Sequence, residues 1–197
     1  MKKLVIFILG ALLSLPILAK TKEIRIDGGI STVDLNEVRK LIKEIEEDSA
    51  VNKVSVGITS PGGEATAGFT IAKLFRRLST RGIAVEIHAS GMCMSACTWI
   101  LASGTPGLRF IEKDTLVLVH PVQFIGRHGL QCISYVEKPT DVDEKVGNAY
   151  LELARDLYME FTGRDLKTVQ GWMTCGREQV GRGKLAVQLG MADKIED

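Results

Sequence analysis

Hydrophobic residues along the chain fall into short apolar runs that alternate with longer stretches of helical periodicity. The short runs are typical of strands buried within a sheet, and they lie at 23–27, 54–58, 84–89 and 116–119. The stretches with helical spacing lie at 34–45, 71–78, 95–102, 140–161, 165–172 and 184–189. Strands that alternate with helices predict a single α/β domain with a mostly parallel sheet. For the first helix the pattern predicts Asp34 as the N-cap, with Glu37 three residues later.

The first nineteen residues have the features of a secretory signal peptide. Lys2 and Lys3 precede an apolar run from Leu4 to Leu18, and Ala19 ends a plausible cleavage site. The run is shorter than the roughly 20 residues that span a bilayer, although an uncleaved signal would leave the protein anchored to the membrane. We therefore expect a signal peptide at 1–19, a mature domain at 20–197 and a periplasmic or secreted bacterial protein.

Composition excludes several classes of function. The 197 residues carry a formal charge of +1, so the sequence does not predict a nucleic-acid partner. Hydrophobic residues make up 45% and charged residues 25%, which are ordinary values for a folded domain and argue against disorder. The sequence has no zinc-type CxxC pair, and we expect neither a metal nor a cofactor.

Three candidate functional residues follow predicted strands, where ligands of parallel sheets bind. Gly63 ends the turn after 54–58, Ser95 follows the strand at 84–89 and opens a helix, and His120 follows the strand at 116–119. Ser95 could act as a nucleophile if His120 took its proton and backbone N–H groups of Gly63 and Ala96 stabilised the oxyanion. The alternatives are structural: Ser95 as an N-cap, His120 as a structural histidine and the glycines as a plain turn.

The order and spacing of these residues resemble the proteolytic subunit of the Clp protease. The resemblance rests on SPGGEATAGFTIAKLF, GMCMSACTWILASG and RFIEKDTLVLVH, with a histidine 25 residues after the serine. It implies the crotonase-like α/β spiral built from ββα units, with Ser95 as nucleophile, His120 as general base and Gly63 and Ala96 as the oxyanion hole. It also implies peptide or unfolded-protein substrates and a homo-oligomer. Other histidines fit less well, since His88 lies inside a strand and His128 in a glycine-flanked loop.

The third catalytic residue is where the sequence departs from the family. Counting back from Ala186 places Glu178 at the position of the family's aspartate, whereas counting forward from Thr162 gives Gly176, so a solvated surface acid is the alternative reading of Glu178. The signal peptide peptidase A type of protein is a more distant resemblance that shares the implied fold and uses a lysine base, for which a lysine such as Lys113 is the alternative here. Because an exported protein has no ATP supply, we expect no ATPase partner.

Four cysteines in an oxidising compartment are expected to pair, and they allow three connectivities. Cys93 and Cys97 flank Ser95, and a turn between them would bring their Cα atoms to roughly 6 Å, so a disulfide there would lock the serine turn. A bond between Cys132 and Cys175 would tie the loop after His120 to the segment before Glu178. The alternative is that the cysteines are buried free thiols.

The sequence is compatible with three functions. The first is an exported, ATP-independent serine peptidase. The second is a catalytically silent member of the fold that binds peptides or a partner protein. The third is acyl-CoA chemistry of the crotonase kind. It is disfavoured because no carboxylate other than that of Glu64 lies next to the oxyanion turn in the sequence.

Overall fold

The computed structural model describes residues 20–126, 129–133, 137–138 and 142–197, so the predicted signal peptide and His128 lie outside the described residues. The strands are β1 Lys20–Asp27, β2 Val51–Ser60, β3 Ala84–Met94, β4 Arg109–Glu112, β5 Leu116–Val119, β6 Gln123–Gly126, β7 Gly129–Cys132, β8 Gln179–Gly181 and β9 Lys194–Glu196. The helices are α1 Thr32–Glu47, α2 Ala65–Thr80, α3 Ala96–Ala102, α4 Val142–Thr162, α5 Leu166–Trp172 and α6 Gly183–Leu189.

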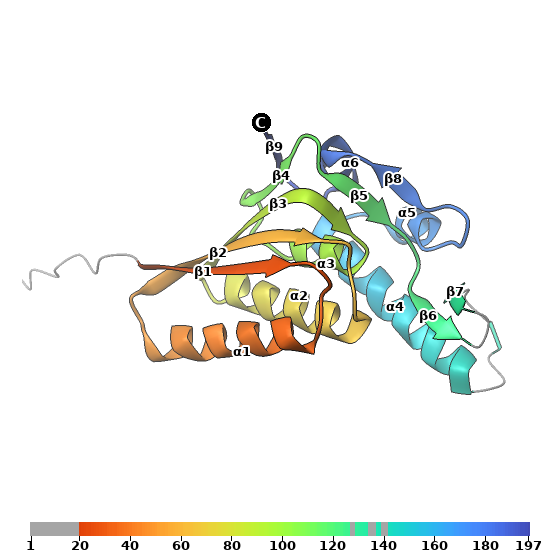
Figure 1. Cartoon of the computed structure of the whole chain (residues 1–197), viewed down its shortest axis with the longest axis horizontal. Coiled ribbons are helices and arrows are strands. Elements are labelled where there is room, and N and C mark those ends of the chain that lie inside the picture. Colours follow the sequence, from red (N-terminus) through yellow and green to blue (C-terminus); the bar gives the residue numbers. More distant parts are fainter. Residues whose placement is uncertain (1–19, 127–128, 134–136, 139–141) are drawn as a thin grey trace, which may run out of the picture.

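The predicted α/β fold with a mostly parallel sheet is confirmed (Figure 1). In the seven-stranded sheet, β1, β2, β3, β4 and β9 follow one another in parallel, and β5 adds to the end of β3. β8 alone runs antiparallel, beside β5, and β6 and β7 form a separate antiparallel pair. The sequence pattern missed the short strands β4 and β6–β9, each of three or four residues, because such short runs do not show a hydrophobic period.

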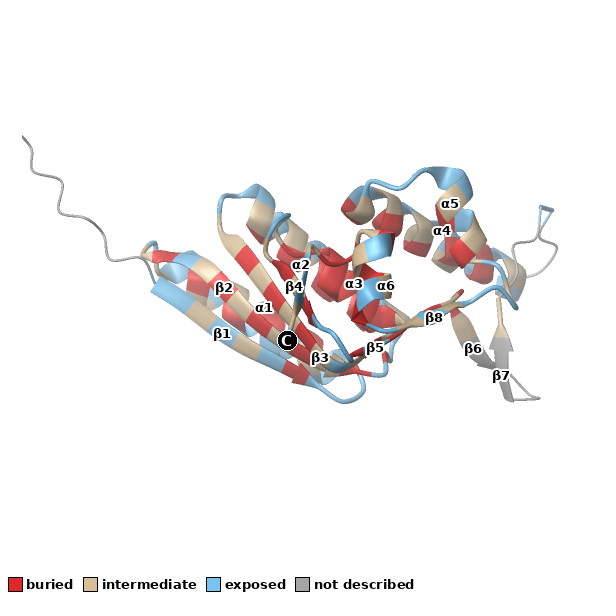
Figure 2. Ribbon diagram, turned by 90° about the horizontal axis from the view of Figure 1, so that it is seen from above, coloured by how far each residue is buried: buried red, intermediate tan, exposed pale blue. Residues whose placement is uncertain are grey.

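The helices place the hydrophobic core on one face of the sheet. Figure 1 shows α1 and α2 side by side below β1 and β2. All seven residues of α3 are buried, and α3 contacts both α2 and α4 (Figure 2). A short helix that is apolar all round is typical of the centre of a core. The serine turn at its start is therefore held by packing on several sides.

The predicted N-cap of α1 is wrong by one helical turn. Ser31 caps this helix, and its hydroxyl accepts a hydrogen bond from the Val33 N–H. Asp34 is instead the third residue of a capping box, since its carboxylate accepts from the Ser31 N–H at 2.8 Å. Both residue types are good N-caps, so the sequence pattern could not choose between them.

A buried ion pair joins the end of the sheet to the ends of three helices. The Arg109 side chain, 9% exposed, donates two hydrogen bonds to the Asp193 carboxylate, from Nε at 2.9 Å and from Nη2 at 2.6 Å. Its Nη1 donates to the carbonyls of Ala102, Phe161 and Gly190, which end or follow α3, α4 and α6. Since helix-end carbonyls lack partners within their helix, one guanidinium satisfies groups on three elements.

Within the part of the chain that is described, no helix is long and apolar enough to cross a membrane. The same residues contain no cluster of three or more histidine, cysteine, aspartate or glutamate side chains that could bind a metal ion.

Candidate active site

Ser95 lies in a strained turn between β3 and α3. The strand runs to Met94, five residues further than predicted, so the serine follows it directly. Its φ of 54° and ψ of −124° make it the one non-glycine residue with a positive φ in the described chain. L-residues rarely adopt such a conformation unless the surrounding structure enforces it, and such strain concentrates at functional sites. The Ser95 N–H donates to the Leu118 carbonyl of β5 at 2.8 Å, which fixes one side of the turn.

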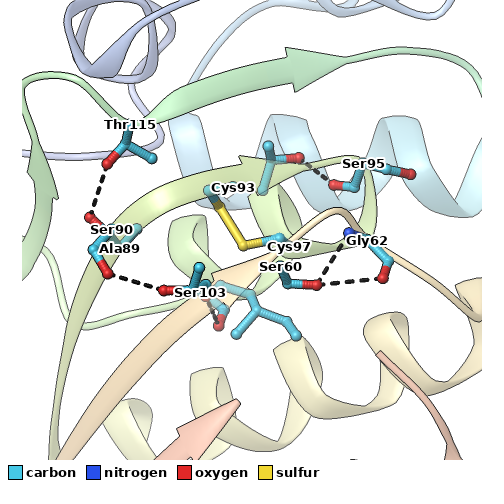
Figure 3. Close-up of a disulfide and its surroundings, with 12 residues drawn as sticks. Ser60, Gly62, Ala89, Ser90, Cys93, Ser95, Cys97, Ser103 and Thr115 are labelled. Atoms are coloured by element: carbon cyan, nitrogen blue, oxygen red, sulfur yellow. Dashed lines mark hydrogen bonds between the residues drawn. A yellow bond between two sulfur atoms is a disulfide. The ribbon is translucent and has the colours of Figure 1, made fainter. Parts of the chain in front are cut away.

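The cysteines on either side of Ser95 are paired across this turn (Figure 3). The Cα atoms of Cys93 and Cys97 lie 5.2 Å apart, within disulfide range, as the spacing predicted. Both residues are fully buried. The disulfide joins the end of β3 to the first turn of α3. Ser95 lies in the short covalent loop that this bond closes.

The glycine turn after β2 packs directly against Ser95. A Cβ added at Gly62, whose φ is 97°, would lie 2.6 Å from the Ser95 Cβ and 2.9 Å from the Met94 carbonyl oxygen. This position therefore requires glycine both for its backbone angle and for space. The Gly62 carbonyl accepts from the Ile30 N–H at 2.8 Å, and the Ser60 hydroxyl accepts from the Gly62 N–H at 3.0 Å (Figure 3). The turn is thus held on both sides.

The described residues offer no hydrogen-bond partner to several backbone N–H groups near the serine, two of which are the predicted oxyanion donors. These two belong to Gly63 and to Ala96, the first residue of α3. The groups directly before or after them along the chain include paired ones: the Glu64 N–H donates to the Ile30 carbonyl at 2.9 Å and the Ser95 N–H to the Leu118 carbonyl at 2.8 Å. Unpaired N–H groups at a helix start and in a glycine turn are the type of donor that forms an oxyanion hole.

A cleft of about 320 Å³ brings Gly63, Ser95 and His120 together, whereas the other predicted site residues, Ala96 and Glu178, do not line it. It is lined by Pro61, Gly63, Glu64, Ala65, Ser95, Trp99, His120, Val122 and Gln123. The Ser95 hydroxyl makes no hydrogen bond to a described residue, and catalytic hydrogen bonds often tighten only when substrate binds. Lys113, the alternative base, follows β4 and does not line the cleft. The sequence pattern missed the contributions of Trp99, Val122 and Gln123, which carry no chemical signature.

The environment of His120 favours a neutral imidazole with a free Nε2. Its Nδ1 lies 2.5 Å from the Pro121 carbonyl oxygen. Since a carbonyl can only accept, the proton is on Nδ1 and Nε2 is left as a proton acceptor. Burial lowers the pKa of His120 below its ordinary value, and this effect outweighs the opposing influence of the Pro121 carbonyl and of the Glu178 charge. The imidazole is therefore uncharged at neutral pH, with its one ring proton on Nδ1, as a general base must be.

Glu178 directly precedes β8, and His120 directly follows its neighbour β5. β8 pairs antiparallel with β5 so that Gln179 is opposite Val119, which brings Glu178 near His120. The carboxylate is exposed and accepts a hydrogen bond from the Gly176 N–H at 3.0 Å. Backbone hydrogen bonds, with a smaller contribution from His120, lower the pKa of Glu178. Among the described residues no hydrogen bond joins the two side chains, so the interaction between them is electrostatic.

The second cysteine pair connects the segments that carry His120 and Glu178. The Cα atoms of Cys132 and Cys175 are 6.1 Å apart, again within disulfide range, as predicted. Next to Cys132, the Ile133 N–H donates to the Val122 carbonyl at 3.0 Å, two residues after His120. Cys175 directly precedes Gly176, which holds the Glu178 carboxylate. The disulfide therefore links the segment that follows His120 to the segment that precedes Glu178.

His88, the other described histidine, lies away from the cleft on β3. Its Nδ1 is 3.0 Å from a Glu196 oxygen and its Nε2 is 3.2 Å from a Glu86 oxygen. Although burial disfavours the charged imidazole, hydrogen bonds to Glu196 and Glu86 raise the pKa of His88. Through its interaction with the Glu196 carboxylate, His88 links β3 to β9, which is the role of a structural residue.

Comparisons with known proteins show the family to which the chain belongs. The sequence profile of the Clp protease family matches residues 13–197. A protein described as an ATP-dependent Clp protease proteolytic subunit from Mesostigma viride is 29% identical over 138 residues, which cover 70% of this chain and 55% of that protein. A protein with the same description from Chlorokybus atmophyticus is 26% identical over 138 residues, covering 70% of this chain and 56% of its own. The match thus spans a little over half the length of these relatives.

Proposed function

Because the chain belongs to the Clp protease family, we propose that it is a serine peptidase whose nucleophile is Ser95 and whose general base is His120. The observation that carries the proposal is the cleft in which Ser95, His120 and Gly63 meet at the carboxyl ends of β2, β3 and β5. Ligands of parallel sheets bind at this edge. A nucleophile, a neutral base and unpaired N–H groups there are the requirements of acyl transfer.

The residues have distinct roles in the proposed reaction. His120 Nε2 takes the proton of the Ser95 hydroxyl as its oxygen attacks the peptide carbonyl, and later gives that proton to the leaving amine. The N–H groups of Gly63 and Ala96 stabilise the oxyanion. Water then attacks the acyl-enzyme. His120 Nε2 takes a proton from this water and gives it to the Ser95 oxygen as the bond between that oxygen and the acyl group breaks. Glu178 raises the proton affinity of His120 by its charge, while the Pro121 carbonyl orients Nδ1.

The setting of this activity is part of the proposal. The N-terminal sequence and the two cysteine pairs support export to an oxidising compartment. There the enzyme would act without ATP, on peptides or unfolded polypeptides, and as a homo-oligomer. Uncleaved, the N-terminal segment would anchor the same domain to the membrane.

A fluorophosphonate probe tests the proposal on the mature protein. The probe phosphonylates activated serines, so we expect a single adduct that peptide mapping by mass spectrometry places on Ser95. Casein and short fluorogenic peptides should be cleaved by the same preparation, and prior labelling should remove the cleavage. Absence of an adduct on Ser95, or cleavage that continues after complete labelling, contradicts the proposal.

Glu178→Gln should shift the pH profile of labelling while leaving the rate at neutral pH almost unchanged. The Glu178 charge raises the pKa of His120, so removing it lowers that pKa further. Labelling requires neutral His120 and is lost as pH falls through its pKa, so the acidic limb should move to lower pH. Glu112→Gln, at the exposed end of β4, is the control. A fall of about 10⁴-fold at neutral pH would instead make Glu178 a full triad member.

One observation favours a second function. Since Glu178 is exposed and no described hydrogen bond joins it to His120, the site could be a catalytically silent peptide-binding cleft. In that case neither casein cleavage nor labelling of Ser95 would be detected, while a peptide would still bind. Binding of a fluorescent peptide, measured by anisotropy on the same preparation, distinguishes this outcome from an unfolded sample.

A further inference from the structure

The carbonyl of Ser95 is the end of a buried hydrogen-bond chain that begins on α4. The Thr98 hydroxyl donates to the Ser95 carbonyl at 2.6 Å, and the Thr98 N–H donates to the same oxygen at 2.9 Å (Figure 3 shows Ser95 in this turn). The Tyr158 hydroxyl lies 2.7 Å from the Thr98 hydroxyl. Because the only proton of the Thr98 hydroxyl goes to a carbonyl, Tyr158 must be the donor to Thr98. The chain therefore runs in one direction, from Tyr158 through Thr98 to Ser95.

Both members of the chain are held firmly in place. Thr98 is fully buried and Tyr158 is 1% exposed. Burial raises the pKa of Tyr158, so its hydroxyl keeps its proton and remains a donor. The Tyr158 ring makes edge contacts with Trp99, at 6.3 Å between centroids, and with Trp172, at 5.8 Å. A donor held by two neighbouring helices, α3 and α5, gives the acceptor a fixed position.

We propose that Thr98 and Tyr158 are positioning residues that hold the Ser95 backbone in its strained conformation and so aim the hydroxyl into the cleft. The turn has a positive φ at a non-glycine residue, which has to be imposed from outside. Leu118 fixes the Ser95 N–H, and the Thr98–Tyr158 chain fixes the Ser95 carbonyl. Neither residue touches the cleft, so each acts through Ser95. This inference rests on the proposed function, because it assigns these residues to the same nucleophile.

The test uses saturation kinetics of fluorophosphonate labelling, which separate probe binding from the bond-forming step. Thr98→Val keeps the shape of the side chain and removes the hydroxyl. We expect the maximal labelling rate to fall roughly tenfold to hundredfold, because small displacements of a reacting group have effects of this size. The concentration for half-maximal rate should stay the same. Thr98→Ser should restore most of the rate, and Tyr158→Phe should produce a smaller fall, since Thr98 can still donate to Ser95.

Ser103→Ala is the matched control, because Ser103 makes the same type of bond at the other end of α3. Its buried hydroxyl donates to the Ile100 carbonyl at 2.7 Å. This variant should lose a comparable amount of thermal stability and keep the wild-type labelling rate. Equal rates for Thr98→Val and wild type, or equal losses for Thr98→Val and Ser103→Ala, overturn the inference. If the wild type is not labelled at Ser95, the proposed function fails, and the inference fails with it.

Discussion

We expect replacement of Ser95 by alanine to abolish the proposed peptide cleavage and the fluorophosphonate labelling. Loss of the nucleophile from a serine hydrolase lowers the rate by about 10⁴-fold or more, because the oxyanion hole and binding alone supply little catalysis. Folding should be retained, since alanine removes a hydroxyl that has no hydrogen-bond partner among the described residues. The measurements are casein cleavage, probe incorporation and the thermal unfolding midpoint of the mature protein.

The control for this variant is Ser90→Ala. Ser90 belongs to β3, the strand that directly precedes Ser95, but its hydroxyl lies 2.9 Å from that of Thr59 and does not line the cleft. This variant should cleave and label at the wild-type rate. Cleavage that persists in Ser95→Ala at the wild-type rate would mean that another residue or a contaminating enzyme is responsible, and would remove Ser95 from the mechanism.

Arg109→Met should lower the free energy of unfolding by about 3–5 kcal/mol, the usual cost of removing one partner of a buried ion pair. The Asp193 carboxylate would lose both hydrogen bonds from the guanidinium, and the carbonyls of Ala102, Phe161 and Gly190 would lose theirs. Denaturant unfolding with the disulfides intact measures the change.

The same substitution at an exposed pair provides the comparison. Arg25 also bonds its aspartate partner, Asp27, at 3.0 Å, but their side chains are 70% and 53% exposed. Exposed ion pairs contribute little to stability, so Arg25→Met should leave the unfolding midpoint almost unchanged. Equal effects of the two substitutions would show that the position of Arg109 at the helix ends has no special importance.

The sequence predicted those parts of the fold that local patterns encode. Short apolar runs and helical spacing located the long elements, and the positions of Ser95, His120 and Gly63 after strands predicted that they would meet at one edge of the sheet. Four cysteines allow three connectivities, and the separation of Cys93 and Cys97 was short enough to favour one of them.

What the sequence could not predict depends on contacts between distant segments. β8 has three residues and no apolar period, so its pairing with β5, which brings Glu178 near His120, is visible only in the structure. The Thr98–Tyr158 bond joins residues sixty positions apart, and neither residue type indicates such a partner. The strained φ of Ser95 likewise results from the packing around it, since serine has no intrinsic preference for that conformation.

The Cys132–Cys175 disulfide would conceal a single cleavage of the chain between these two cysteines. It closes a covalent loop with a separation of 43 residues that contains all of α4. A peptidase that cut its own chain once inside this loop would release no fragment, because the two pieces would stay joined through sulfur. Such a nicked molecule would migrate as an intact chain in a non-reducing gel and separate into two bands only after reduction.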